Sequence, residues 1–283
     1  MSGSVCLLAS YPKSGNTWLR AMLTACLRQR VDINQLVGEN VLIHPDWIEN
    51  ESGIDPAVLS LEQLNELRAR LLMELGRTPS RPTFVKTHSS NLELASGRYL
   101  FTEATGKVVL VVRHPFDVAV SYSHFISRPC EAIVDTMGRA EALIDRPGNT
   151  RPQRLPESMG SWAGNFRSWT DRGQPTLIVR YEDMLNDPAG ILSSVVEFAG
   201  LAFTDEAIEQ AVAGASFERL QQLEEKGGFR QRPATGGRMF RQGRKGAGRS
   251  SLDTALKDHI VESCGSVMES LGYTTSGEAE PIP

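Results

Sequence analysis

Short apolar runs alternate with longer helical patterns along the chain. Val5–Ala9 and Val108–Val112 are unbroken apolar runs, as is typical of strands buried on both faces of a parallel sheet. Residues 83–86 and 176–180 repeat the pattern of a strand followed by a loop. Between residues 19 and 27 apolar side chains return at three- and four-residue spacing, which predicts a helix directly after the first strand. Strands that alternate with helices indicate an α/β fold, a doubly wound parallel sheet flanked by helices in a single domain.

Further helical patterns lie between and after these strands. We predict helices at residues 61–75, 116–127, 158–171, 190–199, 205–225 and 252–271. Ser60 and Gln63 have the spacing of a capping box at the start of the first of these. Residues 145–156 and 226–249 are predicted to be irregular, because proline or glycine is frequent in both.

Length and composition fit one globular domain. The 283 residues are predicted to form a domain at 1–273, with a helical insert at about 31–81 and a flexible tail at 274–283. Hydrophobic residues make up 40% and charged residues 23%, which excludes a disordered polar chain and a coiled coil. A net charge of −4 argues against a general affinity for nucleic acid.

Nothing in the sequence predicts a membrane or secreted protein. The longest apolar runs are too short to cross a bilayer, and the first residues lack the features of a signal peptide. The four cysteines are widely scattered, which indicates reduced thiols rather than a disulfide framework or a zinc site. We therefore expect a cytoplasmic protein that makes no membrane contact.

The loop after the first strand is a candidate anion site. A strand that enters a helix through a glycine-containing loop points backbone N–H groups and a helix dipole at a ligand. Lys13 adds a positive charge, and Ser14, Asn16 and Thr17 add hydrogen-bonding side chains. The alternative is an ordinary turn with an exposed lysine. The Walker A pattern is absent, because Lys13 precedes Gly15, and this weakens a kinase or ATPase interpretation.

All four predicted strands end in polar residues. The endings are the loop at 10–16, Thr87–His88, Arg113–Pro115 and Tyr181–Asp183. Ligands of doubly wound folds bind at the carboxyl ends of the strands. We therefore predict that the four endings converge on one crevice.

Several of these segments resemble a known family. Tyr11–Trp18 closely resembles the 5′-phosphosulfate loop of sulfotransferases that use 3′-phosphoadenosine 5′-phosphosulfate (PAPS). Val112–Phe125 is similar to the family's 3′-phosphate motif, and Arg180–Met184 and Gly243–Gly246 resemble its later signatures, in family order. Gly160–Trp169 resembles bacterial members, including those that sulfate antibiotic scaffolds. The resemblance spans most of the chain and implies a P-loop-like sulfotransferase domain that uses PAPS, releases 3′-phosphoadenosine 5′-phosphate (PAP) and needs no metal.

The resemblance also implies catalytic residues. His88 matches the family's catalytic histidine, and an imidazole suits a general base at neutral pH. Lys13 would neutralise the bridging and leaving phosphate oxygens, and Lys86 would contact the transferring sulfonate. The alternatives are a histidine that is only hydrogen-bonded in its loop and lysines that are solvated surface charges.

Two sets of residues would hold the phosphates of the nucleotide. Besides Lys13 and Ser14, the resemblance assigns Gly15, Asn16 and Thr17 to the 5′-phosphate. It assigns Arg113 and Ser121 to the 3′-phosphate, where a guanidinium fork fits well, with Arg244, Lys245 and Gly246 closing over the same group.

Three aromatic residues would contact the adenine. The resemblance assigns this role to Trp18, Tyr181 and Phe217, although Trp18 and Tyr181 could equally be core aromatics. Ala215 replaces a threonine common in the family, and the Gly-Asp-Trp-Lys sequence that usually follows the Arg-Lys-Gly motif is missing. The family's dimer-forming stretch is not recognisable either, so the oligomeric state stays open.

Two other functions are alternatives to a sulfotransferase. A P-loop kinase would need a magnesium ion, for which Asp117 and Asp183 are ligands by position, although capping or a salt bridge also explains each. A nucleotide or RNA binder would use Lys226–Arg249, which contains eight basic residues, seven glycines and no acid. Such a binder needs interleaved aromatic residues, and only Phe229 and Phe240 are present.

The basic segment 226–249 has another interpretation. Its glycines and repelling charges predict mobility without an anion, and a bound donor would order it as a lid. The acceptor is expected to be a small molecule with a hydroxyl or phenol group. Its identity cannot be predicted, because inserts such as 31–81 and 127–156 would shape its pocket.

Overall fold

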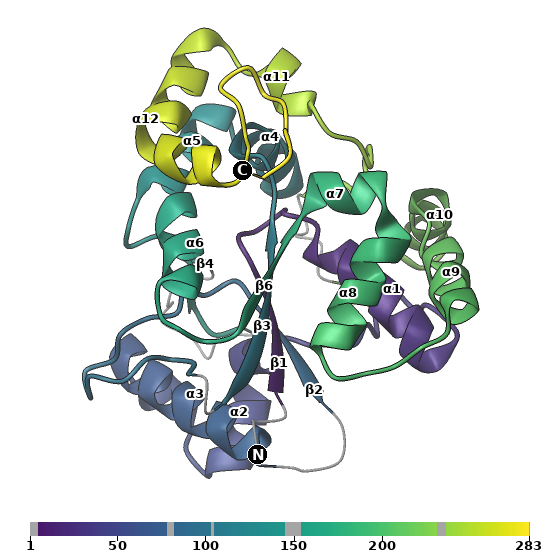
Figure 1. Ribbon diagram of the computed structural model, residues 1–283. Helices are drawn as coiled ribbons and strands as arrows, with labels where there is room; N and C mark the ends of the chain where they lie inside the picture. The colour runs from purple at the N-terminus through teal and green to yellow at the C-terminus, as the bar shows by residue number, and fades with distance from the viewer. Residues whose placement is uncertain (1–4, 78–81, 103–104, 145–153, 231–235, 283) are drawn as a thin grey trace. The chain divides into compact units, whose positions relative to one another are not determined.

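The computed structural model describes residues 5–77, 82–102, 105–144, 154–230 and 236–282 (Figure 1). The chain forms two compact units, each built from three separate stretches of sequence. The first unit comprises residues 1–11, 38–110 and 140–178, and the second comprises residues 12–37, 111–139 and 179–283. The residues predicted for function are divided between them.

Within the described residues, four strands form the main sheet in the order β2-β1-β3-β6. They are β1 (Val5–Ser10), β2 (Thr83–Thr87), β3 (Gly106–Val112) and β6 (Thr176–Arg180), drawn as long arrows in Figure 1. β1 and β2 are parallel, and every residue of β1 is buried. This burial is what an unbroken apolar run requires. The predicted α/β fold, a parallel sheet flanked by helices, is confirmed.

The first unit contains most of the helical insert. The 3-10 turns η1 (Val41–Ile43) and η2 (Pro56–Val58) precede helices α2 (Pro45–Ser52) and α3 (Leu61–Leu75). The predicted capping box of α3 is present. The Ser60 hydroxyl accepts the Gln63 N–H at 3.2 Å, and the Gln63 side chain accepts the Ser60 N–H at 2.9 Å. Apolar residues of α3 then pack against α2.

The first unit ends in a small ladder and a helix. β4 (Leu143–Ile144) pairs with β5 (Glu157–Ser158) in antiparallel orientation, and α6 (Trp162–Thr170) follows. This helix begins four residues later than predicted, because Ser161 caps it by accepting the Gly164 N–H at 3.0 Å. Of the segment predicted to be irregular, residues 145–153 lie outside the described residues.

The second unit is mainly helical. Its helices are α1 (Asn16–Arg28), α4 (Pro115–Ile126), α5 (Cys130–Gly138), α7 (Tyr181–Asn186), α8 (Pro188–Phe198), α9 (Asp205–Gly214), α10 (Phe217–Gly227), α11 (Ala247–Ser251) and α12 (Thr254–Ser270). α1 packs against α8 and α9, and the three lie side by side in Figure 1. α4 packs against α5, α11 and α12.

The single helix predicted at 205–225 is wrong, because the structure has two helices there. α9 ends at Gly214, and α10 begins after Ser216, whose hydroxyl accepts the Arg219 N–H at 3.3 Å. A serine cap offers the backbone a new helix start, and the apolar spacing on either side hides the break. Helices α2 and α5 were not predicted either, and both begin beside a proline, at Pro45 and Pro129.

The basic segment 226–249 and the C-terminal segment 274–283 are both predicted to be mobile. Within the basic segment 226–249, residues 231–235 lie outside the described residues. Phe229 and Phe240 are buried with their ring centroids 6.3 Å apart, so neither ring is exposed for base stacking. In the C-terminal segment, the carbonyl of Thr274 contacts the His114 ring at 3.1 Å. The mobility of both segments stays a prediction.

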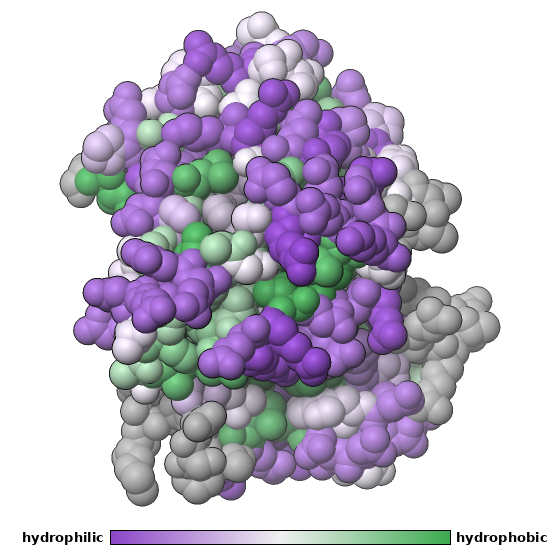
Figure 2. Space-filling model, turned by 90° about the vertical axis from the view of Figure 1, so that its right-hand side faces the viewer, coloured by the Kyte–Doolittle hydropathy of each residue, from purple (hydrophilic) through white to green (hydrophobic). Residues whose placement is uncertain are grey.

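The surface of the described residues is mostly hydrophilic on the face shown in Figure 2. No helix among the described residues is long and apolar enough to span a membrane. On the face shown in Figure 2, hydrophobic residues form smaller areas. The large hydrophobic side chains exposed in the described part of the chain are Ile54, Val58, Met73 and Ile282. The four cysteines, all within the described residues, form no disulfide bond.

Close contact between strands predicts a large effect at Gly106. A Cβ added there would lie 1.9 Å from the carbonyl oxygen of Val5, and neither backbone can move without disturbing the sheet. We expect Gly106→Ala to lower the free energy of unfolding by about 2–3 kcal/mol. Gly138→Ala is the control, because its added Cβ has no neighbour within 4 Å. Denaturant titration with equal midpoints for both variants would contradict this account of the strand.

Candidate functional site

The loop between β1 and α1 has the geometry of an anion site. Lys13 adopts a φ of 69°, and Gly15, the N-cap of α1, adopts a φ of 106° and supplies no side-chain cap. This left-handed backbone turns the chain from β1 into α1. The N–H groups at the start of α1 therefore lie next to the loop, where a helix can bind an anion. A Cβ on Gly15 would lie 2.5 Å from the ring of Tyr181, so glycine is required here for space as well.

Arg113 is the central cation of the second unit. Its guanidinium lies 4.2 Å from the centre of the Tyr181 ring and donates to the carbonyl of Arg244 at 3.0 Å. It also contacts the carbonyl of Lys13 and the carboxylate of Asp117, both at 3.4 Å. Arg113 therefore contacts residues of the loop between β1 and α1, of α4, of α7 and of the basic segment 226–249.

Buried polar atoms in and beside this loop lack a hydrogen-bonding partner within the described protein. Among the described side chains, these include Nε of Arg113 and the hydroxyl of Ser14. A buried donor without a partner costs free energy, so such atoms mark a place where a ligand acceptor fits. Two donors beside a helix start suit the oxygens of a phosphate group.

A cavity in the second unit collects most of the predicted nucleotide residues. Those that line it are Lys13, Gly15, Thr17, Trp18, Arg113, Ser121, Tyr181, Phe217 and Arg244. The predicted residues that do not line it are Ser14, Asn16, Lys245 and Gly246. Lys245 and Gly246 line a second hollow of the same unit. Lining residues that the sequence did not single out for this site are Asp117, Leu185, Met239, Phe240, Arg241, Gln242, Gly243 and Ala247.

Aromatic side chains form one wall of this cavity. The rings of Trp18 and Tyr181 meet edge to face at 5.9 Å, and the Trp18 indole donates to the carbonyl of Ala215 at 3.0 Å. Phe217 packs so closely on the backbone that a Cβ on Gly243 would lie 2.4 Å from its ring. These contacts fix the positions of the rings, and aromatic rings of this kind can contact an adenine base.

Lys13 is held by side chains that carry no charge. Its ammonium donates to the sulfur of Met239 at 2.9 Å and lies 4.0 Å from the centre of the Phe125 ring. Burial lowers the pKa of Lys13 to about 7, and the nearby charge of Arg113 contributes in the same direction. An anionic ligand beside Lys13 would favour its charged form.

His88 lies in the first unit with a fixed ring. Its Nδ1 lies 2.7 Å from the carbonyl oxygen of Ser10, and a carbonyl can only accept. Nδ1 therefore carries the proton, and Nε2 keeps its lone pair. Burial lowers the pKa of His88, and the positive charge of Lys86 lowers it further, so the ring is neutral at pH 7. A neutral imidazole with a free Nε2 lone pair can act as a base.

Glu157 is the residue beside His88 that the sequence analysis missed. Its carboxylate accepts the His88 N–H at 2.8 Å and the Thr87 hydroxyl at 3.1 Å. Burial alone would raise the pKa of Glu157, but the charge of Lys86 and the contacts with His88 hold it below its usual range. Glu157 lies 69 residues beyond His88 in the chain and between the segments predicted as irregular and as helix, so the sequence gave no signal of this position.

The Gly160–Trp169 motif also supports His88. Asn165 donates from its amide to the carbonyl of His88 at 3.1 Å, and the Trp169 indole donates to the carbonyl of Ser89 at 3.2 Å. Both donors belong to α6 and are buried. The Gly160–Trp169 motif, which resembles bacterial members, therefore has a structural role in this chain. It fixes the backbone at His88 and Ser89.

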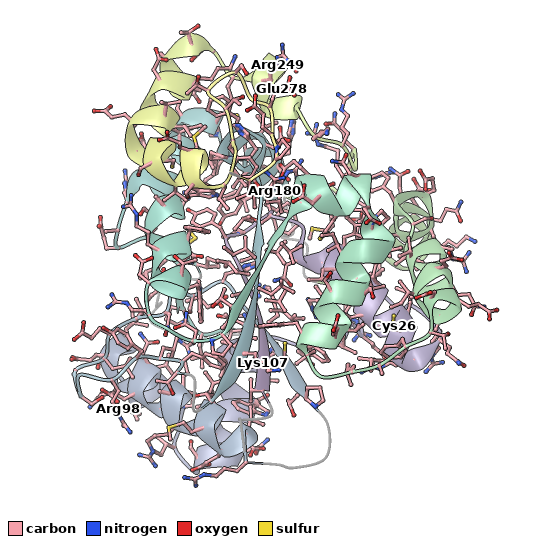
Figure 3. All side chains as sticks on the ribbon, viewed as in Figure 1. Cys26, Arg98, Lys107, Arg180, Arg249 and Glu278 are labelled. Atoms are coloured by element: carbon pink, nitrogen blue, oxygen red, sulfur yellow. The ribbon has the colours of Figure 1, made fainter. Side chains whose placement is uncertain are left out.

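The acids considered as magnesium ligands are already bonded. Asp117 accepts the N–H groups of Gly246 and Gly248 at 2.8 and 2.7 Å. Asp183 accepts from the Arg180 guanidinium through both oxygens at 2.7 Å, at the end of β6 where Figure 3 labels Arg180. These bonds explain both acids without a metal, so a kinase is not favoured.

The two groups of predicted residues lie in different units. His88 and Lys86 belong to the first unit, and Lys13, Arg113 and the cavity belong to the second. Each group is assembled within its own unit. The convergence of all four strand endings on one crevice stays a prediction.

Similar sequences occur in animals and plants. Sulfotransferase 1B1 of Canis lupus familiaris is 26% identical over 219 residues, covering 76% of this chain and 65% of that protein. Flavonol 3-sulfotransferase of Flaveria bidentis is 28% identical over 226 residues, covering 77% and 65%. The matched region thus spans slightly less than two thirds of the length of these relatives.

Solved structures share the fold. Mouse sulfotransferase SULT7A1 complexed with PAP matches with a TM-score of 0.56 and 17% identity, over 92% of this chain and 84% of that chain. Retinol dehydratase in a complex with retinol and PAP matches with a TM-score of 0.60 and 18% identity, over 95% and 82%. The model of the sulfotransferase domain family matches residues 4–272. The chain therefore belongs to the sulfotransferase domain family.

Proposed function

We propose that this protein transfers the sulfuryl group of PAPS to a hydroxyl group of a small-molecule acceptor. The observation that carries the proposal is the cavity that brings Lys13, Arg113 and Ser121 together beside the start of α1. Support also comes from the partnerless atoms of Ser14 and Arg113, which fit phosphate oxygens. Solved relatives of the same fold bind PAP.

Different residues of the second unit would bind different parts of the donor. Lys13, Ser14, Gly15, Asn16 and Thr17 would hold the 5′-phosphate, with the start of α1 supplying backbone donors. A second set would hold the 3′-phosphate, and it consists of Arg113, Ser121, Arg244, Lys245 and Gly246. The adenine would lie against the aromatic wall of Trp18, Tyr181 and Phe217. The bound donor supplies an activated sulfuryl group and a phosphate leaving group.

The first unit would supply the base. Transfer forms a bond between the acceptor oxygen and sulfur, breaks the bond between sulfur and the 5′-phosphate oxygen, and releases the hydroxyl proton. His88 would take this proton at Nε2, because Nδ1–H already donates to Ser10. Lys86 would stabilise negative charge on the sulfonate oxygens. Glu157 and Asn165 hold the His88 backbone, so the ring keeps its direction while it gains charge.

The acceptor class and the location are inferred from the relatives and from the sequence. Relatives of this fold are described in complexes with retinol and androsterone, both of which carry hydroxyl groups. We infer an alcohol or phenol acceptor, a cytoplasmic location, and no part for nucleic acid or membrane. The bacterial type rests on the Gly160–Trp169 motif alone, while the relatives named above come from animals and plants. The oligomeric state stays open.

The donor assignment predicts selectivity for the 3′-phosphate. PAP at about 100 times its Kd should stabilise the protein by about 2.7 kcal/mol, whereas AMP at the same concentration should stabilise it much less. AMP lacks the phosphate that Arg113 and Ser121 would hold. Thermal unfolding with each nucleotide measures this difference, and Arg113→Ala should remove it. Equal stabilisation of the wild-type protein by PAP and AMP would refute the donor assignment.

The lowered pKa of Lys13 predicts proton uptake on binding. Phosphates raise the pKa of a neighbouring ammonium, so a lysine with a pKa of about 7 when free gains a proton when PAP binds above that pH. At pH 8 we expect uptake approaching one proton, and at pH 6 we expect almost none from Lys13. Calorimetry in two buffers of different ionisation enthalpy measures this number. Lys13→Arg, which is always charged, is the control, and equal uptake at pH 8 in both proteins would contradict the prediction.

The base assignment predicts a dependence on the acceptor. His88→Ala should lower turnover about a hundredfold with an aliphatic alcohol, and less with an acidic phenol that needs less help to lose its proton. PAP affinity should change little. Since the pKa of His88 is lowered, the acid limb of the wild-type pH profile should lie below pH 6.5. His259→Ala, on an exposed surface of α12, is the matched control, and near-normal alcohol turnover by His88→Ala would place the base elsewhere.

A further inference from the structure

Asp117 is a buried acid inside the cationic cavity. It lies in the first turn of α4 with 2% of its surface exposed, and it lines the same cavity as Arg113. A carboxylate there repels an anionic ligand, so ligand binding alone does not explain its presence. Its bonds show a different task.

The carboxylate of Asp117 holds the end of the basic segment. Its two oxygens accept the backbone N–H groups of Gly246 at 2.8 Å and Gly248 at 2.7 Å. Gly246 is the N-cap of α11, with a φ of 83°, and has no side chain to cap the helix. Asp117 supplies from α4 the cap that α11 lacks.

Close packing keeps this junction in place. A Cβ on Gly248 would lie 2.3 Å from the carbonyl carbon of Phe116, so the start of α11 lies directly on the start of α4. The same Asp117 carboxylate contacts the Arg113 guanidinium at 3.4 Å, and that guanidinium donates to the carbonyl of Arg244 at 3.0 Å. One carboxylate thus connects Arg113 with the loop of residues 244–248.

We propose that Asp117 is a positioning residue for recognition of the 3′-phosphate. This inference rests on the proposed function, because it takes a 3′-phosphorylated nucleotide as the ligand. Asp117 keeps Arg113 and the 244–248 loop in register before the ligand arrives, which lowers the entropy that binding would otherwise cost. It does so although its own charge opposes the phosphate. Selectivity for PAP over AMP therefore depends on a residue that does not hold the phosphate itself.

The sign of one substitution separates positioning from simple charge. Asp117→Asn removes a negative charge, so repulsion alone would make PAP bind more tightly. Positioning predicts the reverse, because the amide group turns one acceptor oxygen into a donor that faces a backbone N–H. We expect the Kd of PAP to rise about tenfold and that of AMP to change less than about twofold. Asp205→Asn, on an exposed turn of α9, removes the same charge and should leave both values unchanged.

Calorimetric titration of PAP and AMP into these proteins tests the proposal. AMP binding by Asp117→Asn serves as the check that its nucleotide cavity is folded. Gly248→Ala, which strains the same junction from the α11 side, should lose PAP selectivity in the same way. An unchanged or lowered PAP Kd in folded Asp117→Asn would overturn the positioning role.

A second measurement needs no nucleotide. Trypsin should cleave after Arg244 and Lys245 about fivefold faster in ligand-free Asp117→Asn than in the wild-type and Asp205→Asn proteins, because the loop has lost its anchor. An equal cleavage rate would also overturn the proposal. If the wild-type protein itself does not prefer PAP to AMP, the proposed nucleotide function fails, and the cleavage rates still show whether Asp117 anchors the loop.

Discussion

Burial of the Arg113 guanidinium is the constraint on which the nucleotide side of the second unit depends. A buried cation is costly unless neighbouring groups accept its hydrogen bonds or face its charge. Here the Tyr181 ring, the Asp117 carboxylate and the carbonyls of Lys13 and Arg244 do so. These partners come from four separate stretches of sequence. Satisfying one side chain therefore fixes the relative positions of the segments that form the cavity.

In the first unit, a buried acid offsets the charge of a buried lysine beside the histidine. His88, Lys86 and Glu157 are close enough for each charge to shift the pKa of a neighbour. Glu157 offsets the charge of Lys86, while its hydrogen bond to the His88 backbone fixes the segment after β2. A neutral base beside a lysine is stable only if a counter-charge is buried with them. The carboxylate is thus part of what lets the histidine remain a base next to a cation.

The sequence was most informative where a residue type is required by local geometry. The loop around Gly15 was predictable because strand, turn and helix are contiguous. The capping box of α3 was predictable because its two residues lie only three positions apart. Glu157, Asp117 and Glu224, whose carboxylate accepts the Met239 and Phe240 N–H groups, were missed as site residues. The backbone N–H groups that these three carboxylates accept lie 15 to 131 residues away in the chain. An acid whose role is to bond distant backbone has no local pattern.

The same distinction explains why the donor could be predicted and the acceptor could not. A phosphate site needs backbone donors at a helix start, a left-handed glycine and a guanidinium, and each demand selects particular residues. An acceptor pocket needs mainly a shape and one exposed base, and many apolar combinations give the same shape. Here most of the insert at 31–81 and the stretch around residues 140–158 belong to the first unit, with His88, whereas the cavity lined by Arg113 belongs to the second. The contacts of Arg113 with Tyr181, Asp117 and Arg244 lie wholly within the second unit, so no substitution at residues 38–81 removes a partner of Arg113.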